Sequence, residues 1–99
     1  MKYLLLTKHR GAFSELPLGK VRAAKAYIDA RRKRGVIEAI YVFPGGGGIT
    51  IFNAASHKAL MDDLTSYPLF NWVEFEVRPL VEVDDYFAKA LGAGKRARP

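Results

Sequence analysis

The segment from Trp72 to Leu80 alternates apolar and polar side chains almost without error. Val73, Phe75 and Val77 would lie on one face of an extended chain, because successive side chains of a strand point to opposite sides. The opposite face would carry an aromatic ring, two carboxylates and a guanidinium, from Trp72, Glu74, Glu76 and Arg78. The pattern predicts a late strand with one core face and a second face that either meets water or lines a polar cavity.

Hydrophobic periodicity predicts further strands and helices along the chain. Strands are expected over residues 2–8, 36–43, 49–52 and 72–80. Pro17 suits the first turn of a helix, and Gly35 suits the position just after its end. Ser56 suits the N-cap of a second helix, which Pro68 stops by restricting the residue before it. The order of elements is therefore β-α-β-β-α-β.

This order is the split βαβ arrangement of ferredoxin-like domains. It predicts an α+β fold with a four-stranded antiparallel sheet and both helices on one face. The uncovered face is expected to be rich in Tyr, Phe and Trp, and such a surface should not remain wet in a monomer. We therefore expect a homodimer, or a higher even oligomer, in which two sheets pack face to face into an α/β barrel. The ligand cavity is expected between those sheets.

The chain of 99 residues should form one domain, expected over residues 1–91. A short helix from Val83 to Leu91, ended by Gly92, would close it, and residues 92–99 would form a basic, flexible tail. The net charge of +6 comes from two clusters, Arg31–Arg34 and Lys95–Arg98. The first cluster suits a helix C-terminus, where cations favour the macrodipole. Basic and aromatic residues are not interleaved as in single-strand-binding proteins, so nucleic acid is not an expected partner.

Several classes of protein are disfavoured by composition. The chain has no cysteine, so it has neither a disulfide framework nor a thiolate zinc site. Its two histidines, His9 and His57, lack metal-ligand spacing, and no metal or other cofactor is expected. The apolar run Met1–Leu6 is too short for the core of a signal peptide, and no run approaches transmembrane length. We expect a cytoplasmic protein with no membrane partner.

The last third of the chain resembles the muconolactone isomerase family, within the dimeric α/β-barrel superfamily. The resemblance lies above all in the turn Pro68-Leu69-Phe70, the aromatic Trp72 and the acidic strand Glu74–Val77. Weaker matches are Ile51-Phe52-Asn53 and the helical residues Ala59, Leu60 and Leu64, and the order of elements agrees over residues 3–81. The resemblance implies a cofactor-free isomerase of aromatic compound catabolism.

The chain departs from this family at two places. Family isomerases carry a glutamate-rich first helix, where this chain has Ala23–Ala26. They also carry a basic, tryptophan-rich second strand, where this chain has Ile37–Val42 without a basic residue. The chain therefore resembles the family's scaffold more than its active site.

Isomerisation of an unsaturated lactone needs a base beside a carbonyl and a group that stabilises the enolate charge. His9 is a candidate base, because imidazole takes up protons near neutral pH, although an exposed loop histidine is the alternative interpretation. Glu74 is the second candidate base, with Glu76 as its partner, since crowding two carboxylates raises the pKa of one of them. The alternative is that these carboxylates pair with Arg78 in a solvated or dimer contact.

Five residues are candidate substrate-binding groups: Tyr41, Phe52, Trp72, Glu76 and Arg78. Tyr41 and Trp72 could stack on a flat ligand, and Arg78 could bind a carboxylate through two N–H groups. Tyr3, Thr50 and Phe52 are expected to share a face with this set, although a register shift of one residue would reverse the assignment. His57 is expected to be a neutral surface residue at the start of the second helix.

The run Gly45–Gly48 lacks the lysine and the helix of a phosphate-binding loop, so it is expected to be a flexible hairpin loop. Two hypotheses follow from the whole sequence. The first is a small isomerase that acts on a lactone or another unsaturated, oxygenated ring by proton transfer. The second is a non-catalytic dimeric barrel that binds a small molecule or a protein partner.

Overall fold

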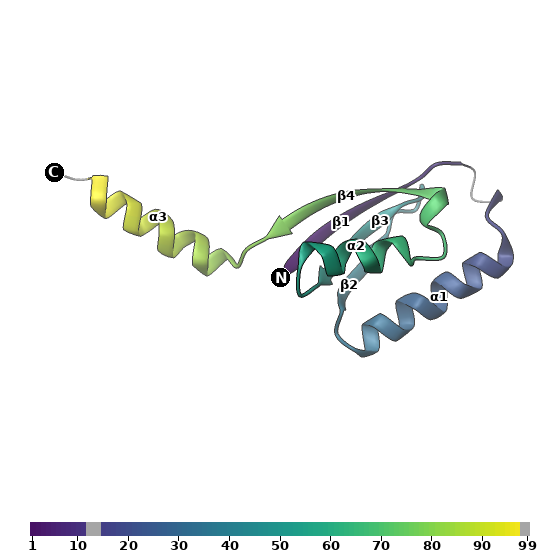
Figure 1. Ribbon diagram of the computed structural model, residues 1–99. Coiled ribbons are helices and arrows are strands. Elements are labelled where there is room, and N and C mark those ends of the chain that lie inside the picture. Colours follow the sequence, from purple (N-terminus) through teal and green to yellow (C-terminus); the bar gives the residue numbers. More distant parts are fainter. Residues whose placement is uncertain (12–14, 98–99) are drawn as a thin grey trace.

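A computed structural model describes residues 1–11 and 15–97, with side chains as far as Gly92. The chain forms one antiparallel sheet with strand order β2-β3-β1-β4 (Figure 1). The strands are β1 (Lys2–His9), β2 (Ile37–Val42), β3 (Gly48–Asn53) and β4 (Val73–Leu80). The helices are α1 (Leu18–Lys33), α2 (His57–Thr65) and α3 (Val83–Ala97), with a 3-10 turn, η2 (Phe70–Trp72), before β4. The predicted ferredoxin-like α+β fold is confirmed.

The core lies between the sheet and the helices α1 and α2. In β1, Tyr3 and Leu5 are buried, and they pair across the ladder with Phe52 and Thr50 of β3. Ile37 of β2 and Leu60 of α2 complete the buried cluster. Residues two apart on a strand share a face, so this face of β1 also carries Thr7 and His9. The run Tyr3–Leu6 is apolar on both faces, so burial against the helices, and not an alternation in the sequence, singles out Tyr3 and Leu5.

Local signals at the helix ends act as the sequence predicts. Pro17 is the N-cap residue of α1, and Gly35 follows its C-cap with φ +75°. The Ser56 hydroxyl accepts a hydrogen bond of 3.1 Å from the main-chain N–H of Ala59. The Ser56 side chain and the Gly35 N–H, which donates to the Arg32 carbonyl at 3.2 Å, satisfy main-chain groups that helix ends leave without partners, whereas Pro17 makes no side-chain cap. The two helices that cover the sheet are thus delimited by their own sequences.

A β-bulge in β2 changes which residues share a face. The pairing with β3 shifts between Ile37 and Ala39, so Glu38 is an extra residue in the strand. After the bulge, Ile40 and Val42 lie on the covered face, and Tyr41 lies on the open one. The expectation that Tyr41 shares a face with Tyr3, Thr50 and Phe52 is therefore wrong.

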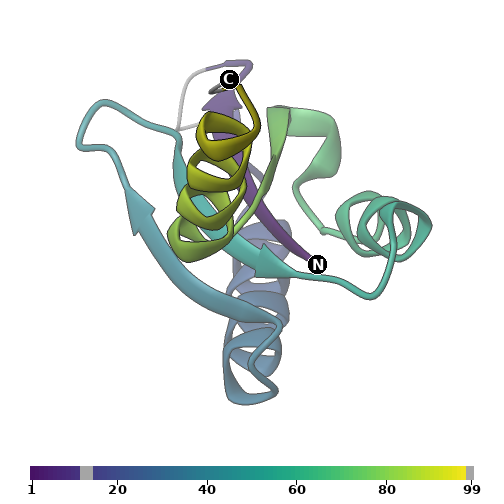
Figure 2. The same cartoon turned by 90° about the vertical axis from the view of Figure 1, so that its left-hand side faces the viewer.

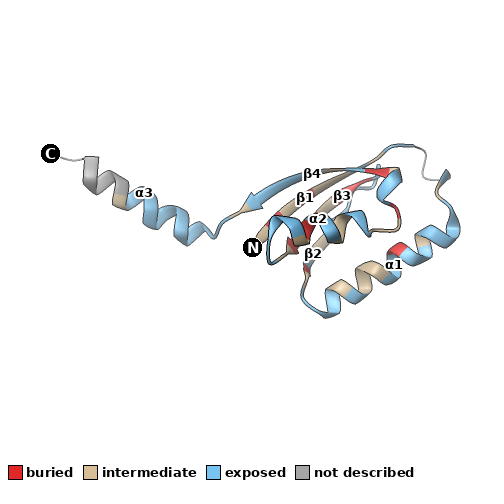
Figure 3. Cartoon of the chain, viewed as in Figure 1, coloured by how far each residue is buried: buried red, intermediate tan, exposed pale blue. Residues whose placement is uncertain are grey.

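Helix α3 extends away from the sheet (Figures 1 and 2). The radius of gyration is 17.3 Å, against about 13 Å for a compact chain of 100 residues. Four large apolar side chains of this helix are exposed: Val83, Tyr86, Phe87 and Leu91 (Figure 3). The helix does not stop at Gly92, because a glycine inside a helix costs only about 1 kcal/mol relative to alanine. It continues through the expected tail as far as Ala97, and residues 98 and 99 lie outside the described residues.

Within the described part of the chain, no helix combines the length and hydrophobicity that crossing a bilayer requires.

Candidate functional site

A pocket of about 120 Å³ lies between the sheet and the helices. Strand β1 contributes Leu5, Thr7 and His9 to its lining, and α1 contributes Tyr27 and Ile28. Strands β2, β3 and β4 provide further walls, and Leu64 and Tyr67 close it from the α2 side. The single chain thus forms a partly open pocket on the face that its helices cover. The expected cavity between two sheets needs a second chain and stays a prediction.

His9 stands at the end of β1, on the covered face. It pairs across the ladder with Val73 of β4, and its Nδ1 atom is buried. The hairpin between β2 and β3 lies against it: a Cβ atom added at Gly46 would be 3.4 Å from His9 Cδ2. The exposed-loop interpretation of His9 is wrong, because the strand continues to this residue and places its ring in the pocket.

The glycine run forms the predicted hairpin loop. Gly46 and Gly47 have φ values of +104° and +76°, in the left-handed region that favours glycine. The Phe43 N–H donates to the Gly47 carbonyl at 2.8 Å, and the Gly46 N–H donates to the Phe43 carbonyl at 2.9 Å. The loop leads directly into β3. Its residues Gly47 and Gly48 line the pocket, so the turn closes one end of it.

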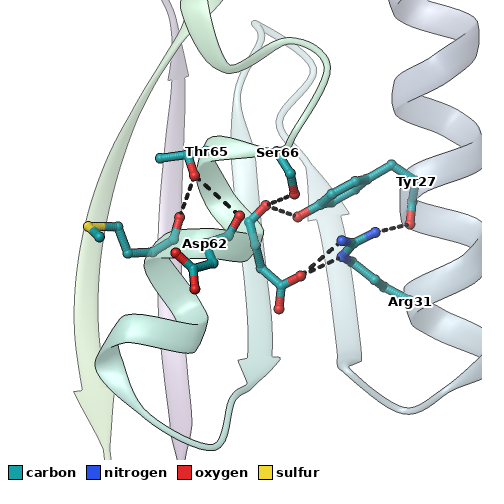
Figure 4. Close-up of polar contacts among 7 residues, drawn as sticks. Tyr27, Arg31, Asp62, Thr65 and Ser66 are labelled. Carbon is teal, nitrogen blue, oxygen red and sulfur yellow. Dashed lines mark hydrogen bonds and ion pairs between the residues drawn. The ribbon is translucent and has the colours of Figure 1, made fainter.

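The wall of the pocket on the helix side is held in place by a contact between α1 and α2 (Figure 4). The Tyr27 hydroxyl donates to the Asp63 main-chain carbonyl at 2.5 Å. Arg31 donates from Nε and Nη2 to Asp63 Oδ1 at 3.2 Å and 2.9 Å. Its guanidinium also lies 3.4 Å from the centroid of the Tyr27 ring, a cation–π geometry. The tyrosine is thus fixed from two sides where it faces the pocket.

Two phenols of the pocket remain neutral over the physiological range. Burial raises the pKa of the Tyr27 phenol, and burial likewise raises the pKa of the Tyr67 phenol. A neutral phenol can donate a hydrogen bond to an oxygen that gains charge during a reaction. Thr50 adds a hydroxyl to the same lining and is only 8% exposed. Sequence reasoning missed Tyr27 and Tyr67 as site residues. The signal for Tyr27 is its position in the sequence, next to the apolar stripe that Leu18, Val21, Ala24 and Ile28 form at helical spacing in α1.

The other predicted site residues lie elsewhere. Glu76 and Arg78 are both exposed on the open face of the sheet, where they form an ion pair of 2.6 Å with each other. Glu74 is exposed and lies 3.7 Å from Arg10. Trp72 belongs to η2, and its carbonyl accepts a hydrogen bond of 2.9 Å from the Arg10 N–H. None of these residues is among the described residues that line the pocket.

Of the predicted set, the structure brings His9 and Phe52 together in the pocket. Tyr41 borders the pocket, but its register places the side chain on the open face, and the residue is 68% exposed. The predicted constellation is therefore divided between the two faces of one sheet.

A wider, open groove runs between α2 and β4, and Glu74 is part of its lining. There the buried Tyr3 hydroxyl lies 2.5 Å from Nδ1 of His57, which is itself exposed. The surface position predicted for His57 is confirmed, but its contact with Tyr3 was missed. Among the described residues, no group of three or more His, Cys, Asp or Glu side chains could hold a metal ion.

The fold and the pocket define a small α+β protein with a pocket between its sheet and its helices. The model of the muconolactone delta-isomerase family matches residues 14–85, so the chain belongs to this family. The resemblance seen in the turn before β4 and in β4 itself is thereby confirmed. Among curated proteins, no sequence matches this chain.

Two solved structures show the same fold. One is a crystal structure of muconolactone isomerase, with a TM-score of 0.64 and 22% identity over 83% of this chain and 90% of that one. The other is 5-chloro-2-hydroxyhydroquinone dehydrochlorinase from Burkholderia phenoliruptrix, in complex with 2,5-dihydroxybenzoquinone. Its TM-score is 0.70, with 16% identity over 83% of this chain and 95% of that chain.

Proposed function

We propose that this protein is a cofactor-free isomerase that moves a proton between two carbons of a small, unsaturated, oxygenated ring. The observation that carries the proposal is the position of His9, a basic side chain in an otherwise largely apolar pocket beside two partly buried phenols, those of Tyr27 and Tyr67. Membership of the muconolactone delta-isomerase family supports the reaction class.

In this proposal the imidazole of His9 removes a proton from a saturated carbon next to the double bond that is conjugated with the ring carbonyl. The electron pair of the broken C–H bond delocalises into the carbonyl, which becomes an enolate. Hydroxyl groups of Thr50 and Tyr67 donate hydrogen bonds to that oxygen. The imidazolium then returns the proton to another carbon of the conjugated system, so the double bond moves and no atom is gained or lost.

We favour His9 over Glu74 as the base because of their surroundings. Glu74 is exposed and lies near the guanidinium of Arg10, in the groove and not in the pocket. Glu74 therefore does not contact a ring held in the pocket that His9 lines.

We also propose that the protein assembles as a homodimer through the open face of its sheet. The centre of that face carries Leu4, Leu6, Ile49 and Ile51, each only partly exposed in the single chain. Helix α3 adds an apolar stripe that nothing in one chain covers. A second copy would cover both surfaces, in keeping with the preference of soluble proteins for closed, symmetric oligomers.

A non-catalytic binding barrel is the second candidate. The Glu76–Arg78 ion pair favours it, because the most polar part of β4 faces the proposed assembly surface and not the pocket. The two candidates differ in whether His9 is needed for turnover, so one mutational experiment separates them.

The experiment follows the double-bond shift of muconolactone and of its methyl ester by ultraviolet absorbance. His9→Gln should lower turnover by about 100-fold or more, because general-base catalysis contributes that much. Glu74→Gln is the matched control and should change turnover by less than about threefold. Thermal melting of both variants checks that they fold. Equal turnover in wild type and His9→Gln would reject the mechanism.

A further inference from the structure

We infer that the pocket selects an uncharged ligand with a single ring and excludes rings that carry a carboxylate. This inference deepens the proposed function, because it concerns the substrate class of the same pocket. It rests on the size of the pocket, on the charge of its lining and on the shape of its walls.

The size of the pocket limits the ligand to one ring. Its volume of about 120 Å³ is slightly below that of a cavity of about 150 Å³ that accepts benzene. A second ring would extend out of this space towards solvent. A charged side arm would have to enter the apolar interior or turn back towards the mouth beside Val42.

The described lining offers hydroxyl groups and an imidazole, but no Lys or Arg side chain that could pair with a carboxylate of the ligand. Among the described residues that line the pocket, none is Lys, Arg, Asp or Glu. The titratable side chains that face the pocket are His9 and the phenols of Tyr27 and Tyr67, since the Tyr41 side chain lies on the open face of the sheet. Removing a carboxylate from water without a cationic partner is strongly unfavourable, whereas an uncharged ring gains from burial.

The guanidinium of Arg31 is not available as that partner. It stacks on the Tyr27 ring, and both of its hydrogen bonds to Asp63 converge on one carboxylate oxygen. Arg31 and Asp63 are 15% and 30% exposed at their side chains, so this pair is mutually neutralised and partly removed from water. Recruiting Arg31 for a ligand would leave Asp63 without its partner.

The walls favour a flat ring. The Tyr27 and Tyr67 rings meet edge to face with centroids 5.2 Å apart, and Tyr67 meets Phe75 at 6.2 Å in the same manner. Phe52, only 1% exposed, adds a further aromatic wall. Aromatic faces and edges arranged in this way bind planar rings better than bulky aliphatic ones. Cyclic enones, lactones, phenols and quinones without an acid group fit these requirements.

A turnover experiment tests the charge requirement. Muconolactone carries an acetate arm, and its methyl ester keeps the ring and the reactive C–H group but loses the charge. The ester should have a kcat/KM at least about tenfold higher than the acid. Val42→Arg places a cation at the pocket mouth and should lower this ester-to-acid ratio by about tenfold, whereas Val42→Gln should leave the ratio unchanged. A wild-type preference for the acid would overturn the inference.

A binding experiment tests the same inference without any turnover. Hydroquinone and 2,5-dihydroxybenzoate share a ring and two hydroxyl groups, and only the second carries a carboxylate. Hydroquinone should bind at least about tenfold more tightly, with NMR shift changes at Thr50, Tyr67 and Phe75. Equal binding of the two compounds, or binding of neither, would overturn the inference. If hydroquinone binds selectively but neither lactone is converted, the proposed isomerase reaction fails and the substrate class stands.

Discussion

A side chain at Gly47 would collide with the main-chain carbonyl oxygen of Thr7. The hairpin between β2 and β3 therefore packs directly on the end of β1, two residues before His9. Gly47 also has φ +76°, which other residues adopt only with strain. The position of the candidate base thus depends on a glycine that is distant from it in sequence.

Gly47→Ala should destabilise the protein by about 1–3 kcal/mol, because it adds both a steric collision and a left-handed backbone strain. Urea denaturation measures this change. Gly45→Ala is the matched control within the same loop, since a Cβ there meets nothing within 4 Å and its φ is not positive. A Gly47→Ala variant as stable as Gly45→Ala would show that the hairpin can move away from β1.

Arg31→Met should lower the free energy of unfolding by about 1.5–3 kcal/mol, because it removes charge-assisted hydrogen bonds to the partly buried Asp63. The methionine keeps much of the packing against Tyr27. Lys58→Met is the control: it removes the exposed Lys58–Asp62 pair of 2.9 Å and should cost no more than about 0.5 kcal/mol. Equal costs for both variants in urea denaturation would contradict the role given to the α1–α2 contact.

The protein should lose stability as the pH rises above about 10, the ordinary pKa of tyrosine in an unfolded chain. Burial raises the pKa of Tyr67 in the folded state, so the unfolded chain gives up this proton first. Below that pH both states hold the proton, and the contribution of Tyr67 is fully present. It is lost as the pH rises towards the folded-state pKa.

Tyr67→Phe provides the measurement for this pH dependence. The variant has no phenol to titrate, so its free energy of unfolding should fall less steeply than that of wild type at alkaline pH. The lysines titrate in both proteins and cancel in the comparison. Identical pH profiles for the two proteins would mean that the pKa of the Tyr67 phenol does not differ between the folded and unfolded states.

Light scattering tests the proposal that a second copy of the chain covers the apolar stripe of α3. Wild type should have the mass of at least two chains, and Phe87→Ser should shift the equilibrium towards one chain. The side chain is 54% exposed in the single chain, so this substitution removes an interface contact and not a core contact. Lys89 lies two residues from Phe87 and therefore on the opposite side of the helix, so Lys89→Ser should leave the mass unchanged. A monomeric wild type would contradict both parts of the assembly proposal.

Local sequence signals determined the order of elements, the ends of α1 and α2 and the fold class. Ser56 caps α2 and Gly35 follows α1 because main-chain groups at a helix end need nearby partners. The alternation of β4 sorted its side chains between two faces, since that property of a strand is local. The turn at Pro68–Phe70 and the following strand were enough to indicate the family that the comparison confirms.

The tertiary structure alone decided where the site lies. The bulge at Glu38 depends on how β2 pairs with β3, and it moved Tyr41 away from Phe52. Tyr27 and Tyr67 entered the pocket because α1 and α2 pack together through Asp63, a contact between residues that are far apart in sequence. Such pairings are chosen by the packing of whole elements, which periodicity within one segment does not specify. By itself the sequence therefore determined the scaffold, whereas contacts between its elements decided which side of the sheet holds the pocket.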